Sequence, residues 1–147
     1  MTVWPRLPAF SPSLPAVRYR TARPTATAAS LEACQKFYGP EGLGLPLIST
    51  FSDDTFDGVI LGMPDHGHQL EFTFDKRHVG MNCDAPTKDN LLVFYLETKD
   101  AVKAVADRLL ATGLGRIVEA ENVWWNQNEG VTVEGPEGWR VCLFYDQ

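Results

Sequence analysis

Two stretches of this sequence resemble each other, and each has near its end a residue that can do chemistry. Residues 58–72 read GVILGMPDHGHQLEF and residues 130–144 read GVTVEGPEGWRVCLF. Both begin with Gly-Val, have a proline six residues later with an acid after it, and end in an apolar segment. An alignment of Gly67 with Gly138 places Glu71 opposite Cys142. A carboxylate can serve as a general base or a metal ligand, and a thiolate as a nucleophile or a metal ligand.

The composition is that of one ordinary globular domain. The chain has 147 residues, of which 44% are hydrophobic and 22% charged, and its formal net charge is −6. The 13 basic residues are scattered, so we expect no binding to nucleic acid. Three cysteines without CxxC spacing are typical of a reducing compartment. We expect a cytoplasmic protein without membrane contact, since neither a signal peptide nor a membrane span is present in the pattern.

The elements follow the order β-α-β-β-β twice. In the first half, the pattern predicts a strand at 17–23, a helix at 28–38 and strands at 47–53, 56–63 and 68–75. In the second half, it predicts a strand at 89–97, a helix from Asp100 to about Gly113 and strands at 115–123, 130–134 and 139–145. The predicted organisation is a Pro-rich arm at 1–16 and a single domain at 17–147, made of a module at about 17–75, a linker at about 76–88 and a module at about 89–147.

The sequence resembles the vicinal oxygen chelate (VOC) superfamily of glyoxalase I, bleomycin-resistance proteins and extradiol dioxygenases. The resemblance rests on FYGPEGLGL (37–45), HQLEF (68–72) and GPEGWRVCLF (135–144), while RTARPT (20–25) and APTKDNLLVFY (85–95) are similar to glyoxalase-like members of unknown function. The resemblance implies an α+β fold of two tandem βαβββ modules that form a curved mixed sheet around a cup. It also implies a homodimer, and metal ligands on the first and fourth strands of each module.

Strand alternation predicts which side chains face the cup. In residues 68–74 the apolar Leu70, Phe72 and Phe74 should pack on the helix layer, and Gln69 and Glu71 should face the cup. The same rule, with the alignment for the first strand, gives a predicted set of cup residues: Tyr19, Arg23, Gln69, Glu71, Leu91, Tyr95, Arg140 and Cys142.

The family's metal positions fall on Tyr19, Glu71, Leu91 and Cys142, which make a poor donor set because leucine offers no ligand atom. We therefore expect no metal and no other cofactor; a retained divalent ion would use Glu71. His66 and His68 do not extend the set, because His66 lies in a predicted turn and alternation sends His68 to the face opposite Glu71.

Trp124 and Trp125 are predicted to lie in a β-hairpin, where one packs and the other lines the cup. An aromatic wall beside Tyr95 suits a flat or cationic organic ligand. The expected partners are thus a small organic ligand and a second copy of the chain.

Two function classes remain open from the sequence, together with a module for protein interaction. A metal-independent enzyme, a lyase or isomerase, would use Glu71 as a base, with Arg23 or Arg140 holding an anionic group. A sequestering protein of the bleomycin-binding type would only hold its ligand. A metal-dependent lyase, isomerase or dioxygenase is the alternative within the enzyme class.

Overall fold

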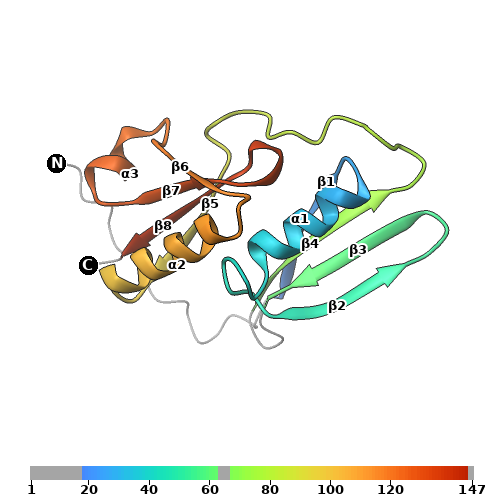
Figure 1. Ribbon diagram of the computed structural model, residues 1–147, viewed down its shortest axis with the longest axis horizontal. Helices are drawn as coiled ribbons and strands as arrows, with labels where there is room; N and C mark the ends of the chain where they lie inside the picture. The colour runs from blue at the N-terminus through green and yellow to red at the C-terminus, as the bar shows by residue number, and fades with distance from the viewer. Residues whose placement is uncertain (1–17, 63–66, 146–147) are drawn as a thin grey trace.

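The computed structural model describes residues 18–62 and 67–145, which form two βαβββ modules (Figure 1). The first module consists of β1 (Tyr19–Thr25), α1 (Ala28–Tyr38), β2 (Leu47–Ser52), β3 (Phe56–Leu61) and β4 (His68–Asp75). The second consists of β5 (Leu91–Leu96), α2 (Lys99–Ala111), β6 (Arg116–Val118), α3 (Val123–Gln127), β7 (Val131–Glu134) and β8 (Arg140–Tyr145). The predicted arm, residues 1–16, and the turn that holds His66 lie outside the described residues.

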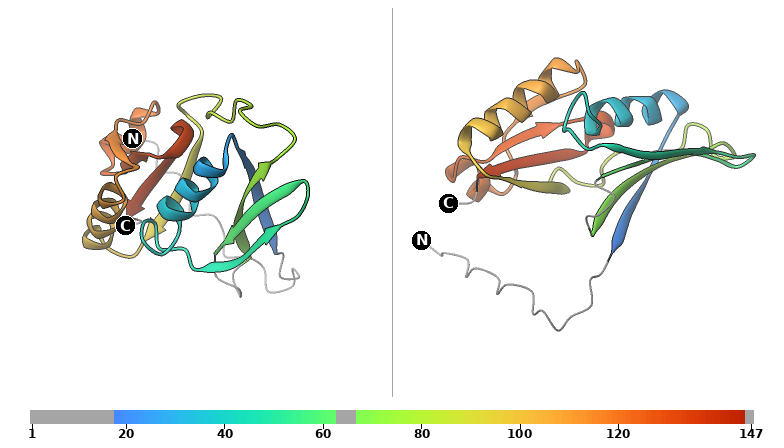
Figure 2. Two further views of the ribbon diagram at one scale, coloured as in Figure 1. Left: turned by 45° about the vertical axis from the view of Figure 1, so that its right-hand side comes forward. Right: turned by 90° about the horizontal axis from the view of Figure 1, so that it is seen from below.

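Each module forms a four-stranded mixed sheet, in the order β1-β4-β3-β2 and β5-β8-β7-β6. In both sheets the first and last strands of the module pair in parallel, and the remaining pairs are antiparallel. Helices α1 and α2 lie on the same side of the two sheets (Figure 2, right). We call the opposite side of each sheet its cup face. The predicted α+β fold of two βαβββ modules is confirmed.

Helix α1 begins where the sequence predicts because Thr27 and Ser30 form a capping box, each side chain accepting a hydrogen bond from the other's backbone N–H. Its inner face buries Cys34, Phe37 and Tyr38 completely. These side chains join those of α2 and both sheets in one shared core. The two modules therefore fold as one unit.

Polar contacts also join the modules. Arg23 of β1 lies 3.7 Å from the carboxylate of Glu137, in the turn between β7 and β8. Glu137 has a φ of 60°, in the left-handed region, and accepts a hydrogen bond from the N–H of Ala26. Arg108 of α2 donates to the carbonyls of Gly42 and Leu43 after α1.

The predicted strand 115–123 is wrong beyond Val118. The chain leaves the sheet there because Asn126 binds both the N–H and the carbonyl of Ala120 with its side-chain amide. Asn122 then caps a short helix, α3, by accepting from the N–H of Trp124. The two tryptophans consequently lie on a helix and not in the β-hairpin that the sequence predicted.

Helix α2 packs its apolar face against the core. Val102, Ala106 and Leu109 are buried, but Leu110 remains 39% exposed. None of the helices within residues 18–62 and 67–145 has the length and apolar character that crossing a bilayer requires.

Candidate functional site

Alternation along β4 places its side chains as predicted. Leu70, Phe72 and Phe74 are buried under the helices. Glu71 lies on the cup face between its strand neighbours Ala22 and Ile60. His68 points to the helix side, where its ring stacks on that of Tyr19, so the prediction that His68 and Glu71 face opposite sides is confirmed.

The prediction for β1 is wrong. Because β1 is parallel to β4, with Tyr19 opposite His68 and Arg23 opposite Phe72, these two residues share the helix-side face and do not point into the cup. Arg23 is buried, and its guanidinium carbon lies 4.9 Å from the ring centroids of both Phe72 and Trp139. It therefore packs between the modules and does not reach a ligand in the cup.

Arg20, and not Arg23, is the arginine that lies beside Glu71 on the cup face. Its Nη1 donates to Oε2 of Glu71 at 2.8 Å, and its Nη2 donates to Oε1 of Gln69 at 3.2 Å. Glu71 is only 16% exposed in its side chain, whereas Arg20 is 45% exposed. The site on the first sheet is thus a carboxylate paired with an arginine, which the weak alternation of β1 did not reveal. A cavity of about 280 Å³ lies at this end of the sheet, lined in part by Tyr19, Arg20 and Gln69.

The aromatic ring of Phe51 covers part of the cup face of the first sheet. Phe51 lies opposite Gly58, and a Cβ built on Gly58 would come within 2.1 Å of the Phe51 ring. Only glycine leaves room for the ring to lie flat on the sheet.

The cup face of the second sheet carries an aromatic cluster, which we define as Tyr95, Trp124, Trp125 and Phe144. The Phe144 centroid lies 5.5 Å from that of Trp124, 5.4 Å from that of Trp125 and 5.8 Å from that of Tyr95. Both tryptophans therefore lie on the cup face. Tyr95 is 62% exposed, and the other three rings are half-buried. Leu91 occupies the same face, as alternation predicts.

Cys142 and Arg140 share this face but are covered. Cys142 is completely buried, its sulfur packed close to Gly130, and burial raises the pKa of its thiol. Arg140 is buried and donates to Glu134 and to the carbonyls of Lys88 and Glu119. The predicted roles of Arg23 and Arg140 as anchors for an anionic group are therefore not supported, because neighbouring groups occupy both guanidinium groups.

The residues at the family's metal positions do not form a ligand set. Tyr19 points away from Glu71, and Cys142 lies under the start of β7 with a raised pKa. The cross-strand neighbours of Glu71 are an alanine and an isoleucine, and its ion-pair partner is the cationic Arg20; none of these is a metal ligand. Among the residues that the structure describes, no three His, Cys, Asp or Glu side chains come together around a common point.

Two family profiles match the chain: the YycE-like N-terminal domain over residues 19–73 and the YycE-like C-terminal domain over residues 89–145. The uncharacterized protein YycE of Bacillus subtilis (strain 168) is 39% identical over 132 residues, which cover 89% of each chain. A 2.0 Å crystal structure of YycE, a protein of unknown function, superposes with a TM-score of 0.75 at 36% identity and covers 90% of this chain and 91% of that one.

More distant structures share the fold. The trypanothione-dependent glyoxalase I of Leishmania major has a TM-score of 0.61 at 19% identity, covering 86% of this chain and 84% of that one. TnmS3, an antibiotic binding protein from Streptomyces sp. CB03234, has a TM-score of 0.59 at 15% identity, covering 92% and 98%. At these identities the similarity shows the fold alone.

Proposed function

Because the chain belongs to the YycE-like family, with the glyoxalase/bleomycin-resistance fold of the VOC superfamily, we propose that it binds a small planar aromatic molecule in its cup without a divalent metal. The observation that carries the proposal is the aromatic cluster on the cup face of the second sheet. An enzyme and an antibiotic-binding protein both occur on this fold, so the choice between them depends on the site itself.

The cluster offers ring surfaces and few charges. Trp124 and Trp125 meet edge to face, with centroids 4.9 Å apart, and both lean on Phe144. Such an arrangement leaves ring faces and edges open for stacking with a flat ligand, and a cationic ligand gains further from the ring quadrupoles. The amide of Asn126 supports this surface by fixing the chain that leads into α3.

Metal independence follows from the donor chemistry at the four family positions. A divalent ion requires several oxygen, nitrogen or sulfur ligands around one point. In this chain an exposed tyrosine on the wrong face, a leucine and a covered thiol occupy three of the positions, and Glu71 is paired with Arg20. The proposed function therefore involves no metal.

The test uses acridine orange, a planar aromatic cation, as the probe. We expect saturable binding that Trp124→Ala and Trp125→Ala each weaken about two- to tenfold, since an aromatic contact contributes about 0.5–1.5 kcal/mol. Tyr145→Phe is the matched control. Tyr145 follows Phe144 in β8 and packs on the opposite face of that strand, so this substitution should leave the affinity unchanged. Equal affinity in both tryptophan variants and the wild-type protein would refute the proposal.

A second candidate function rests on the ion pair of Arg20 with Glu71. A carboxylate that is mostly shielded from water and held in place by a guanidinium could remove a proton from an acidic C–H of a ligand in the cup. In that case the protein would exchange this hydrogen for solvent deuterium, and Glu71→Gln would abolish the exchange without weakening ligand binding. Exchange at the same rate in Glu71→Gln would exclude Glu71 as the base.

A further inference from the structure

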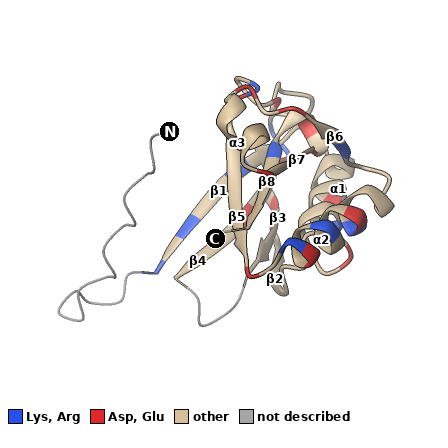
Figure 3. Cartoon of the chain, turned by 90° about the vertical axis from the view of Figure 1, so that its left-hand side faces the viewer, with Lys and Arg blue, Asp and Glu red and all other residues tan. Residues whose placement is uncertain are grey.

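The aromatic cluster is an apolar surface that is partly open to solvent. Tyr95 is 62% exposed, and Val123 at the start of α3 is 59% exposed. The elements that carry the cluster have almost no charge: β5 and α3 contain no charged residue, and β8 contains only the buried Arg140 (Figure 3). Open apolar surfaces of this kind mark sites where another segment or molecule binds.

The rings of the cluster stand nearly at right angles to one another. Tyr95 and Trp125 are inclined to Phe144 by 86° and 79°, and the two tryptophans are inclined to each other by 84°. Tyr95 and Trp124 lie 5.8 and 5.5 Å from Phe144, so their ring centroids are at most about 11 Å apart. Aromatic surfaces are what proline-rich segments dock on, and a P-x-x-P segment in the polyproline II conformation spans about 9 Å.

The chain itself contains such segments. The arm, residues 1–16, reads MTVWPRLPAFSPSLPA and has the P-x-x-P spacing twice, at Pro5–Pro8 and at Pro12–Pro15. The fixed φ of proline favours polyproline II, which lowers the entropy cost of docking. The arm has one arginine and no acidic residue, whereas the whole chain has a net charge of −6, so the charges of the arm and the rest of the chain are complementary.

The arm joins the domain on the side of the cup. It leads into β1, an edge strand of the first sheet, and the N-terminal end of β1 lies on the side away from α1 and α2 (Figure 2, right). Pro8 precedes Arg18 by ten residues, which span about 31 Å in polyproline II. A compact chain of this length measures about 40 Å across. Pro5–Pro8 can therefore reach the second sheet without passing around the helices.

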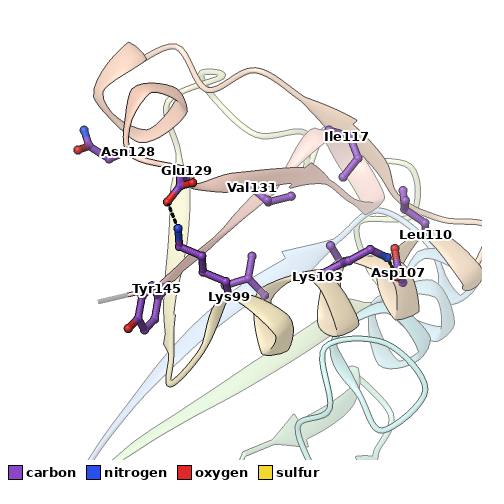
Figure 4. Close-up of a pocket in the computed structure, with 11 residues that line it drawn as sticks. Lys99, Lys103, Asp107, Leu110, Ile117, Asn128, Glu129, Val131 and Tyr145 are labelled. Atoms are coloured by element: carbon purple, nitrogen blue, oxygen red, sulfur yellow. Dashed lines mark hydrogen bonds and ion pairs between the residues drawn. The ribbon is translucent and has the colours of Figure 1, made fainter. Parts of the chain in front are cut away.

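A cavity of about 380 Å³ beside α2 fits the arm less well. It lies on the helix side of the second sheet, and its rim carries the ion pairs of Lys99 with Glu129 and of Lys103 with Asp107 (Figure 4). Tyr145 is the only aromatic residue among the described residues that line it. The cavity therefore lacks the ring surfaces that a proline-rich segment requires.

We infer that Pro5–Pro8 of the arm docks on the aromatic cluster of the same molecule and covers this part of the cup. The two prolines pack against the rings, and Arg6 between them places its guanidinium over the open ring of Tyr95. The docking itself does not depend on a ligand. Its consequence, that the arm must leave before a planar molecule can stack on the cluster, rests on the proposed function.

The experiment places a nitroxide on the arm of the full-length protein, at Ser11→Cys. The three native cysteines are buried, so the reagent modifies the new thiol. We expect the nitroxide to broaden the indole N–H signals of Trp124 and Trp125 and to leave that of Trp139 sharp, since Trp139 packs on the buried Arg23 on the helix side. Sharp signals from both Trp124 and Trp125 would overturn the docking.

A mixed sample separates docking within one molecule from docking on a second copy. Isotope-labelled protein without nitroxide is mixed with nitroxide-labelled protein of natural isotope content, so only contacts between molecules can broaden the observed signals. We expect the tryptophan signals to stay sharp in this mixture. Broadening as strong as in the doubly labelled protein would place the arm on a second copy and would overturn docking within one molecule.

Two matched variants identify the segment that docks. Pro5→Ala combined with Pro8→Ala should remove most of the broadening at Trp124 and Trp125, because this variant lacks the prolines that pack on the rings. Pro12→Ala combined with Pro15→Ala removes the same number of prolines from the same arm and should retain the broadening. Equal loss in both variants would overturn the assignment to Pro5–Pro8.

Acridine orange then tests whether the docked arm covers the cluster. The variant with Pro5→Ala and Pro8→Ala should bind it about three- to tenfold tighter than the wild type, since an arm that leaves the cluster free in about 10–30% of molecules lowers the apparent affinity by that fraction. The variant with Pro12→Ala and Pro15→Ala should bind it as the wild type does.

The two readouts distinguish failure of this inference from failure of the proposed function. Equal acridine orange affinity in the wild type and in the variant of Pro5 and Pro8 would overturn the covering of the cluster by the arm, while the proposed function would stand. Broadening of the Trp124 and Trp125 signals in a protein that binds no acridine orange would refute the proposed function and would support the docking.

Discussion

Replacement of Arg23 by methionine should strongly destabilise the protein. Arg23 is the buried cation between the modules, with the carboxylate of Glu137 at 3.7 Å and the rings of Phe72 and Trp139 each 4.9 Å away. It also donates to the sulfur of Cys34 at 2.9 Å. Methionine retains a long apolar side chain but removes every one of these polar contacts.

The magnitude follows from the carboxylate that is left behind. The side chain of Glu137 is 11% exposed, and one of its oxygens has no hydrogen bond. Removal of one partner of a buried ion pair costs about 3–5 kcal/mol, because the other charge stays buried without compensation. Domains of this size are stable by about 5–15 kcal/mol, so Arg23→Met should remove a large share of the free energy of unfolding.

The loss should depend on pH. Burial raises the pKa of Glu137, partly offset by the N–H of Ala26 and by Arg23. Without Arg23, the pKa of Glu137 in the folded protein should rise further above its unfolded value. A group with a raised folded pKa binds its proton more tightly in the native state, so stability is greatest below the unfolded pKa and falls as the pH rises through the folded pKa. The cost of Arg23→Met should therefore be smaller at pH 5.5 than at pH 8.

The assay is urea unfolding, followed by circular dichroism at both pH values, of the wild type, Arg23→Met, Glu137→Gln and the double variant. The double variant should be more stable than the sum of the single effects predicts, by about 0.5–3 kcal/mol, since neither charge remains alone. A cost below about 1 kcal/mol for Arg23→Met at pH 8, or an equal cost at both pH values, would refute this account of the contact.

Three further predictions concern other parts of the molecule. Gly58→Ala should lower the free energy of unfolding by about 1–3 kcal/mol, because its Cβ would overlap the ring of Phe51; Phe51→Leu in the same chain should restore part of the loss, and a full loss in the double variant would contradict this cause. Iodoacetamide at pH 8 should modify less than one thiol in the native protein and three after denaturation, since all three cysteines are buried and burial raises the pKa of Cys34 to about 11; rapid native labelling would disprove the burial. Elemental analysis of protein purified without tag or chelator should find no stoichiometric metal in the wild type or in Glu71→Ala, and a metal lost only in the variant would restore metal-dependent chemistry.

Some parts of the candidate site could be predicted from local pattern alone. Alternation placed Glu71, Leu91 and Tyr95 on the cup face. In β4 it also identified the core side, because one face of that strand is apolar and the other polar. The same reasoning failed at β1. Most of its residues are exposed on both faces, so its alternation carried no information about which face the core covers.

Helix α3 could not be predicted for a related reason. Trp124 and Trp125 favour strands by propensity, and a helix of five residues is too short to show a helical period that would contradict this preference. Only the amide of Asn126, which binds Ala120, and the cap at Asn122 turn the chain into a helix over the second sheet. The helix in turn brings both rings to Phe144, which lies nearly twenty residues further along the sequence.

By itself, the sequence determined the order of the elements other than α3, the duplication and the residues that share a strand face, because these depend on periodicity within a few residues. Tertiary structure decided which arginine meets Glu71, since the partner of Glu71 depends on the register between β1 and β4, 51 residues apart. It also decided that Leu110 is left exposed beside Ile117 and that Arg23 links the modules. These outcomes depend on how whole elements pack against each other, and the local spacing of residues does not specify that packing.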